Sequence, residues 1–327
     1  MAVLTQLARR TVNDWLIQFD VGELTDLEEI SAGIENSNFF INTLNQSGVQ
    51  RWVLTLLEQT YSSRELLVPL NRALLESGMP VAAIKTNQQG DSITNCAGKQ
   101  AILAQCLSGS HPTNPTSSQC AAVGRFLARF HRAALPVRAN ARLFNRDLNW
   151  LQRRADDVRA YLPYKDQALL QQVLAQLKSL FARRDVARLP TGIIHGDLFR
   201  DNVLFDERGL SGVLDFHHAG EHYLLFDIAV AANDWCTQTN GELDPERLIA
   251  LLKAYHQQRT LTTEELWFLP IFMTYGASAF WLSRLTSRYP PPKTLPVALK
   301  NPDEFQAIVT ERCAHFYYFD HRLLQQA

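Results

Sequence analysis

Residues 193–205 read IIHGDLFRDNVLF, a hydrophobic run, a polar segment and a second hydrophobic run. The two apolar runs are typical of short β-strands, and the segment between them carries a His, two Asp and an Asn. That is more polarity than a plain connection needs, so the segment is a candidate functional loop. A third apolar run, residues 212–214, leads into Asp215. The sequence therefore predicts that Asp197, Asn202 and Asp215 lie at the ends of short strands.

The spacing of these side chains matches phosphoryl transfer. In that reaction one carboxylate orients an attacking hydroxyl, while an amide oxygen and a second carboxylate hold Mg²⁺ on the nucleotide phosphates. Kinase catalytic loops place the Asn five residues after the catalytic Asp, which is the separation of Asp197 and Asn202, with His195 two residues before the Asp. The alternative is a hydrophilic hairpin with a capping Asp and a turn Asn. The position of Asp215 favours phosphoryl transfer.

The composition indicates a globular protein. The 327 residues are 46% hydrophobic and carry a formal net charge of −1, so no basic surface for nucleic acid or a membrane is indicated. The start of the chain lacks a basic segment followed by a long apolar run, and no later stretch reaches about eighteen uncharged apolar residues. The 5 Cys lack CxxC spacing and are expected to be reduced. We expect a cytoplasmic protein without nucleic-acid or membrane partners, and its oligomeric state stays open.

The pattern of residues predicts strands first and helices later. An amphipathic opening is followed by expected strands at 27–31, 38–44, 50–57, 91–94 and 100–106, with a helix from 62 to 78 between the third and fourth. Helices are expected at 118–134, 147–161, 167–184, 223–235, 245–256 and 264–288, with the strands of residues 193–216 as a small island of sheet. We predict an α+β fold in which residues 1–106 form a small β-rich lobe and residues 107–327 a larger, mainly helical lobe.

Six segments carry a resemblance to known proteins. They are GIENSNFF (33–40), VLTL (53–56), VGRFLARFH (123–131), HGDLFRDN (195–202), VLDF (213–216) and AANDWC (231–236). With them the chain resembles, nearly end to end, the aminoglycoside phosphotransferase and choline kinase-like superfamily, and within it the bacterial homoserine kinases. The resemblance implies a bilobal protein-kinase-like fold with ATP in the cleft. It also implies conversion of L-homoserine to O-phospho-L-homoserine, a step of threonine biosynthesis.

The resemblance assigns roles in the loop of residues 195–202, the catalytic loop. Asp197 would align the acceptor hydroxyl and take its proton late, because a solvated Asp with a pKa near 4 is a weak base. Asn202 and Asp215 would be the Mg²⁺ ligands, and His195 would orient the loop without touching substrate.

The nucleotide would be held by the first strands. The turn that would cover the ATP phosphates has a single Gly, so side chains as well as backbone amides would cradle them, although an ordinary hairpin turn explains the same residues. The expected phosphate contacts are Gly33, Asn36, Ser37 and Asn38, and the hinge that meets adenine would run from Gln105 to Leu107.

Thr55 departs from the superfamily pattern, which has a phosphate-binding Lys at this position. A hydroxyl cannot neutralise phosphate charge. The replacement cation stays open, with Lys85, Lys99 and Arg51 as candidates that are also ordinary surface charges.

A zwitterionic acceptor needs a partner for its carboxylate and one for its ammonium group beside Asp197. Arg284 offers a planar, two-pronged donor on an otherwise apolar helix, the alternative being a structural ion pair with an acid such as Asp234. Further candidate substrate contacts are Asp234, Asn233, His217 and Trp235. Asp227, at the start of a helix, is expected to cap that helix or brace the catalytic loop.

Three other functions remain open at this point. The first is a metallohydrolase that uses His195, Asp197, His217, His218 and His222, although the oxygen ligands are better spaced for Mg²⁺. The second is a nucleotide-binding module without turnover, suggested by Thr55. The third is the same chemistry on choline, an aminoglycoside or a sugar amine, where choline would call for an aromatic cage and an aminoglycoside for an acidic cleft.

Overall fold

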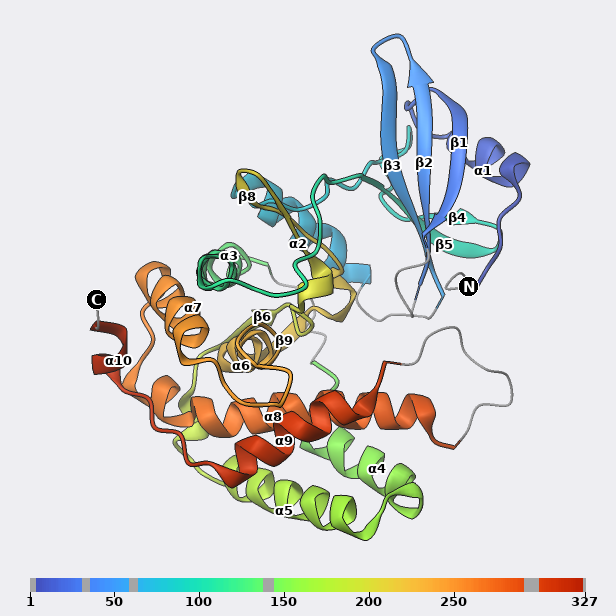
Figure 1. Ribbon diagram of the computed structural model, residues 1–327. Coiled ribbons are helices and arrows are strands. Elements are labelled where there is room, and N and C mark those ends of the chain that lie inside the picture. The colour runs from blue at the N-terminus through green and yellow to red at the C-terminus, as the bar shows by residue number, and fades with distance from the viewer. Residues whose placement is uncertain (1–3, 31–35, 59–63, 138–143, 291–299, 326–327) are drawn as a thin grey trace.

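The computed structural model describes residues 4–30, 36–58, 64–137, 144–290 and 300–325. A five-stranded antiparallel sheet occupies the N-terminal region and helices make up most of the remainder, so the predicted α+β, protein-kinase-like class is confirmed (Figure 1). The boundary between residues 106 and 107 stays a prediction. Strand β5 ends at Gln105 and helix α3 begins at Ser117.

The sheet has the strand order β1-β2-β3-β5-β4. Its strands are β1 (Glu23–Ile30), β2 (Ser37–Asn45), β3 (Gly48–Leu57), β4 (Thr94–Cys96) and β5 (Lys99–Gln105), and helix α1 (Arg9–Leu16) packs on one face. Alternation along β3 buries Leu54 and Leu56 against α1, whereas Thr55 points to the opposite face beside Asn38 and Ile102. Ile102 belongs to the core of the helical part, so this opposite face is the one that faces the helices.

The strand expected at 91–94 is wrong in position, since β4 covers Thr94–Cys96. Residues 87–91 form a turn instead. The Asn87 side-chain oxygen accepts the backbone N–H groups of Gln89, at 3.0 Å, and of Asp91, at 2.7 Å. This local side-chain bond holds the backbone away from the sheet.

The helices share one large apolar core. They are α2 (Arg64–Glu76), α3 (Ser117–Ala133), α4 (Leu148–Val158), α5 (Tyr164–Phe181), α6 (Leu224–Trp235), α7 (Pro245–Gln258), α8 (Thr263–Arg288), α9 (Pro302–Ala314) and α10 (His321–Gln325). Although α2 precedes β5 in sequence, its stripe of Leu66, Leu70 and Leu74 packs into this core. Two of the long helices begin at capping boxes, α3 at Thr116 and α8 at Thr262.

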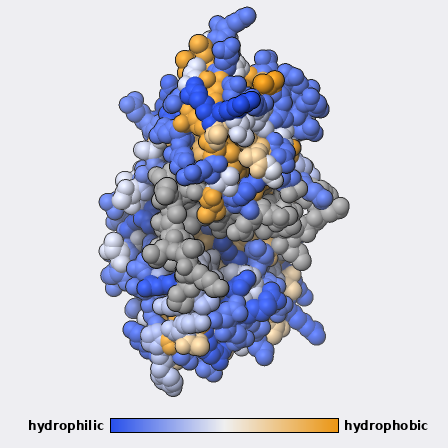
Figure 2. All heavy atoms as spheres, turned by 90° about the vertical axis from the view of Figure 1, so that its right-hand side faces the viewer, coloured by the Kyte–Doolittle hydropathy of each residue, from blue (hydrophilic) through white to orange (hydrophobic). Residues whose placement is uncertain are grey.

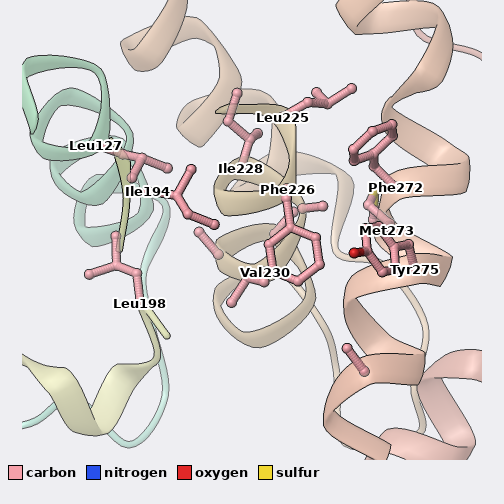
Figure 3. Close-up of a cluster of buried hydrophobic side chains, with 14 of the residues drawn as sticks. Leu127, Ile194, Leu198, Leu225, Phe226, Ile228, Val230, Phe272, Met273 and Tyr275 are labelled. Carbon is pink, nitrogen blue, oxygen red and sulfur yellow. The ribbon is translucent and has the colours of Figure 1, made fainter. Parts of the chain in front are cut away.

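The predicted island of sheet is present. It consists of two antiparallel pairs, β6 (Thr191–Ile194) with β9 (Gly220–Tyr223) and β7 (Val203–Asp206) with β8 (Gly209–Val213). All twelve residues of α6 are buried behind it. In Figure 3, α6 places Ile228 toward Ile194 of β6 and Phe226 toward Tyr275 of α8. Helix α6 thus lies between the strands of this small sheet and helix α8.

Helix α8 is long and apolar enough to cross a membrane, by length and composition alone, and it is the one such helix among the described residues. In the fold, however, 78% of its most apolar window is buried. On the face that Figure 2 shows, the helical part is mainly hydrophilic, whereas hydrophobic side chains gather on the sheet part. The helix is therefore a core element of this fold.

The contact between α3 and α7 requires a glycine. A Cβ added at Gly124 would lie 2.2 Å from the Leu251 carbonyl oxygen, which is backbone and cannot move aside cheaply. We expect Gly124→Ala to lower the free energy of unfolding by about 2 to 3 kcal/mol, measured by urea denaturation. Gly276→Ala in α8 is the matched control, because its Cβ would find neighbours no closer than 3.5 Å and gains helix propensity of about 1 kcal/mol. Equal losses in both variants would contradict this packing argument.

Candidate active site

The carboxylate of Asp227 holds the start of the catalytic loop. Its Oδ2 accepts the His195 N–H at 2.7 Å and its Oδ1 accepts the Gly196 N–H at 2.7 Å. The buried His131 donates Nε2–H to Oδ2 at 3.1 Å and accepts the Tyr255 hydroxyl at Nδ1. Burial alone would raise the pKa of Asp227, but the bonds from His131 and the loop amide outweigh it and hold that pKa below its usual value. The expected bracing role of Asp227 agrees with these bonds.

Gly196 makes the sharp turn before Asp197. Its φ of 77° lies in the left-handed region, and a Cβ there would meet the Phe144 ring at 2.5 Å. The turn directs the chain from β6 into the loop, where the Asp197 side chain is half-buried.

His195 ties the loop to the strand that ends before Asp215. It is fully buried, donates Nε2–H to the Leu214 carbonyl at 3.0 Å and accepts the Asp197 N–H at Nδ1 over 3.3 Å. These partners assign the neutral Nε2–H tautomer. Both ring nitrogens are engaged, which agrees with an orienting role and leaves neither for a transition metal. His222, another histidine of the metallohydrolase alternative, bonds the Tyr275 hydroxyl and burial lowers its pKa to about 4.

Asp197, Asn202 and Asp215 are brought together. The Asn202 amide nitrogen donates to the Asp197 carbonyl at 2.7 Å and to its carboxylate Oδ2 at 3.0 Å. The Leu214 N–H donates to the Asn202 carbonyl at 2.9 Å, which places Asp215 next to the pair. Asn202 therefore keeps its Oδ1 for another partner, and Asp215, held in a left-handed conformation with φ of 59°, adds a carboxylate. Such hard oxygen donors suit Mg²⁺.

Burial raises the pKa of Asp197 above its ordinary value. The charges of His218 and Arg146 oppose that rise, whereas Asp215 adds to it. A carboxylate with a raised pKa is a better proton acceptor than a solvated one.

Helix α6 holds the far end of the loop through its last turn. Asp234 accepts the Arg200 backbone N–H at 2.7 Å and its Nε and Nη2 at 3.1 and 3.2 Å, and the buried Trp235 donates Nε1–H to the Leu198 carbonyl at 3.0 Å. Asn233 is buried and donates to the Met273 carbonyl of α8 at 2.7 Å. Asp234 and Trp235 thus bond the loop, whereas Asn233 bonds α8. The expected contact of these three residues with the acceptor stays a prediction. His217, expected beside them, lies next to Asp215 at the half-buried edge of the site.

Arg284 is engaged elsewhere. Its Nη1 donates at 2.7 Å to Glu304 Oε2 and at 2.7 Å to the Asn301 carbonyl, and its Cζ lies 4.4 Å from the centre of the Phe305 ring. Arg284 thus forms a structural ion pair, which was the alternative to acceptor binding. The partner expected for that pair, Asp234, is wrong, because Asp234 pairs with Arg200. Contact of Arg284 with the acceptor stays a prediction.

On the sheet, Thr55 and Asn38 form one polar pair on the face toward the helices. The Thr55 hydroxyl donates to Asn38 Oδ1 at 2.7 Å. Ser37 is fully buried, accepts the Leu4 and Thr5 N–H groups and donates to Glu58. The Asn36 side-chain oxygen accepts the Glu58 N–H at 3.3 Å, and Gly33 lies outside the described residues. Among the predicted phosphate contacts, Asn38 and Thr55 are therefore the described side chains shown on the face toward the helices.

The candidate replacement cations lie away from that pair. Lys99 forms an ion pair with Glu58, on the α1 side of the sheet. Arg51 pairs with Glu28 at 3.5 Å and stacks on Phe40. Lys85 lines a cavity of about 440 Å³ together with Gln50, Arg51, Trp52, Ala83, Ile84, Gln105 and Cys106. The cavity adjoins the predicted hinge at Gln105 and does not reach the catalytic loop, while Leu107 packs against Gly212.

Two cations beside the loop carry no signal in the sequence. Lys300 pairs with Asp201 at 2.6 Å, and Arg146, which precedes α4, is buried near Asp197. Neither belongs to a motif, and both reach the site only through the tertiary fold.

Comparison with known proteins agrees with this geometry. Residues 26–261 match the family model described as phosphotransferase enzyme family. The chain belongs to the phosphotransferase enzyme family. It is 38% identical to the homoserine kinase of Cupriavidus necator over 95% of this chain and 96% of the relative. It is also 39% identical to that of Methylobacillus flagellatus, over 96% of each.

Solved structures show the same fold at low identity. An amicoumacin kinase in complex with AMP-PNP, Ca²⁺ and Ami superposes with a TM-score of 0.69 at 16% identity, covering 94% of this phosphotransferase and 92% of that chain. A microcompartment-associated aminopropanol kinase gives 0.68 at 15% identity, covering 94% of each. The bilobal kinase fold is thus shared across different enzymes.

Asp227 should be critical for the phosphotransferase fold. Asp227→Asn removes a buried anion and turns an amide donor toward N–H groups that need acceptors. We expect a loss of about 3 kcal/mol in the free energy of unfolding, measured with urea. The control Asp156→Asn disrupts an exposed pair with Arg159 and should change stability by less than about 0.5 kcal/mol. An Asp227→Asn variant as stable as the control would rule out the bracing role.

His131 should make the protein sensitive to acid. Burial lowers its pKa, although Asp227 opposes this, so the folded state binds a proton less readily than the unfolded state. Stability from this group is complete above a pH of about 6.5 and falls as the pH drops toward the folded pKa, by up to about 1.4 kcal/mol per pH unit. Urea midpoints between pH 7.5 and 5.5 should fall more steeply in the wild type than in His131→Gln. Equal slopes would contradict a buried neutral His131.

Proposed function

We propose that this phosphotransferase transfers the γ-phosphoryl group of ATP to the hydroxyl of L-homoserine and works in the cytoplasm. The observation that carries the reaction class is the hydrogen-bonded unit of Asp197 and Asn202 with Asp215 beside it. The acceptor is supported by the nearly full-length similarity to homoserine kinases at 38 and 39% identity.

In this mechanism Asp197 accepts a hydrogen bond from the acceptor hydroxyl and sets its oxygen in line with the γ-phosphorus. A bond forms between that oxygen and phosphorus, the bond to the bridging oxygen of ADP breaks, and the hydroxyl proton passes to Asp197. Asn202 restrains the carboxylate by its 3.0 Å bond. His195 bonds the backbone N–H of Asp197 and the carbonyl of Leu214, the residue before Asp215. The reacting groups would therefore meet in a prearranged geometry.

Asn202 Oδ1 and the Asp215 carboxylate fit a divalent cation and would hold Mg²⁺. When bound, it would neutralise charge on the phosphate oxygens. Asn38 and Thr55 would contact those phosphates from the sheet, with Asn36, Ser37 and Gly33 shaping the turn above them. Gln105 and Leu107 would form the hinge at the adenine.

The test is a coupled assay of ADP release with L-homoserine, choline, L-serine, L-threonine and an aminoglycoside. We expect L-homoserine to give the highest kcat/KM. Asp197→Asn should lower kcat at least about 100-fold while ATP still binds. If another acceptor is clearly preferred, the homoserine assignment fails, and if ATP binds but no acceptor releases ADP, the chain is a silent nucleotide-binding module.

The raised pKa of Asp197 predicts the pH profile. Because the ionised carboxylate is the active form, kcat/KM should fall as the pH drops through that pKa, with a midpoint above the value of about 4 for a solvated Asp. Rates between pH 4.5 and 8 provide the measurement, and Asp197→Asn should lose this acid limb. A limb that persists in the variant would assign it to another group.

A further inference from the structure

Arg146 is a buried cation that forms no ion pair with any residue that the structure describes. Its side chain is 6% exposed, and Nη1 is buried with no hydrogen-bond partner among the described residues. Its Cζ lies 4.3 Å from the centre of the Phe280 ring of α8. A guanidinium stays charged at any physiological pH, and a cation–π contact offsets only part of the cost of burying it. Within the described part of the chain, this buried positive charge therefore has no carboxylate in hydrogen-bond contact.

The backbone around Arg146 is pinned against the catalytic loop. The Phe144 N–H donates to the Glu221 carbonyl at 3.1 Å, and the Phe144 ring packs on Gly196, directly before Asp197. The Arg146 carbonyl accepts the Tyr275 hydroxyl at 2.7 Å. These contacts fix the arginine between the loop and α8.

Phe280, under the guanidinium, also reaches the loop. Its ring meets Phe199 edge-on, with 4.5 Å between the ring centres. Arg146 is near enough to Asp197 for its charge to lower the pKa of that carboxyl against the rise caused by burial. Arg146 and the loop thus share one aromatic contact, through Phe280 and Phe199.

The other cations near the loop are already paired. Lys300 binds Asp201, and Arg200 binds Asp234. Arg284 binds Glu304. Of the described arginine and lysine side chains named here around the loop, Arg146 is thus the one without an ion pair.

We infer that Arg146 binds the carboxylate of the acceptor and that the enzyme thereby selects alcohols that carry a carboxylate. This inference rests on the proposed function. The planar fork of an arginine matches a carboxylate with two parallel bonds, and such charge-assisted bonds are strong in a buried site. An acceptor without a carboxylate leaves the guanidinium buried and unpaired, and a polycationic acceptor is repelled.

The test compares L-homoserine with 3-amino-1-propanol, which is the same molecule without the carboxylate. The wild type should prefer L-homoserine. Arg146→Ala should raise KM for L-homoserine about 10- to 100-fold, as expected for charged hydrogen bonds of about 1.5 to 3 kcal/mol. It should not lower kcat/KM for 3-amino-1-propanol, which makes no bond to the guanidinium, so the preference is lost. Arg146→Lys should recover only part of it, because lysine supplies a point charge without the fork.

Controls separate binding from a structural role. Arg183→Ala removes another arginine that lies over a phenylalanine, 5.1 Å from the Phe268 ring, but is exposed and paired with Asp185. It should leave the substrate preference unchanged. Added guanidinium ion should partly restore the activity of Arg146→Ala toward L-homoserine and not toward 3-amino-1-propanol. KM for ATP and the melting temperature should stay near wild type.

Two results would overturn the inference. One is an Arg146→Ala variant that keeps its preference for L-homoserine. The other is equal loss of activity on both acceptors, which would assign Arg146 to general support of the site.

Failure of the proposed function can be distinguished from failure of the inference about Arg146. If the wild type does not phosphorylate L-homoserine, the homoserine assignment fails, and the same comparison is made for L-serine with ethanolamine and for L-threonine with 1-amino-2-propanol. If the wild type prefers the acceptor of each pair that carries a carboxylate, and Arg146→Ala loses this preference, the inference holds although the homoserine assignment does not. If the wild type shows no such preference, and calorimetry detects no binding of the carboxylate members, the inference fails too.

Discussion

The buried carboxylate of Asp227 is the interaction on which the catalytic loop depends. It accepts two successive backbone N–H groups of the loop, at His195 and Gly196, and a side-chain N–H from His131 of α3. A buried anion is stable only when its oxygens are satisfied in this way. One side chain of α6 thus fixes the backbone where β6 ends and where the loop turns at Gly196, directly before Asp197.

The same helix holds the loop at both ends. Asp227, near the start of α6, binds the first residues of the loop, while Asp234 and Trp235, at its end, bind Arg200 and the Leu198 carbonyl. Because α6 is wholly buried between the catalytic strands and α8, its position is set by apolar packing (Figure 3). The core therefore supplies rigidity, and charged hydrogen bonds transmit it to the reacting groups. This division suits phosphoryl transfer, where positioning and electrostatics contribute most of the catalysis.

The parts of the site that the sequence predicts are local in the chain. The pairing of Asp197 with Asn202 can be predicted from sequence because one short loop brings both together. The fold class follows from strands before residue 106 and helices after 117. The acceptor contacts are harder to predict from sequence, because they depend on which buried polar groups find partners across the fold. Arg284 stands out in sequence on an apolar helix and Arg146 does not, yet the first meets Glu304 and the second forms no ion pair among the described residues. Of the neighbouring residues at the end of α6, Asp234 and Trp235 bond the loop and Asn233 bonds α8, which the sequence alone did not distinguish.

The structure of the protein with AMP-PNP, Mg²⁺ and L-homoserine tests the central claim most directly. The account predicts the acceptor hydroxyl about 3 Å from the Asp197 carboxylate and aimed at the γ-phosphorus, with the acceptor carboxylate on Arg146 and the metal ion between Asn202 and Asp215. A hydroxyl bound away from Asp197, with the loop in the same conformation, would contradict it.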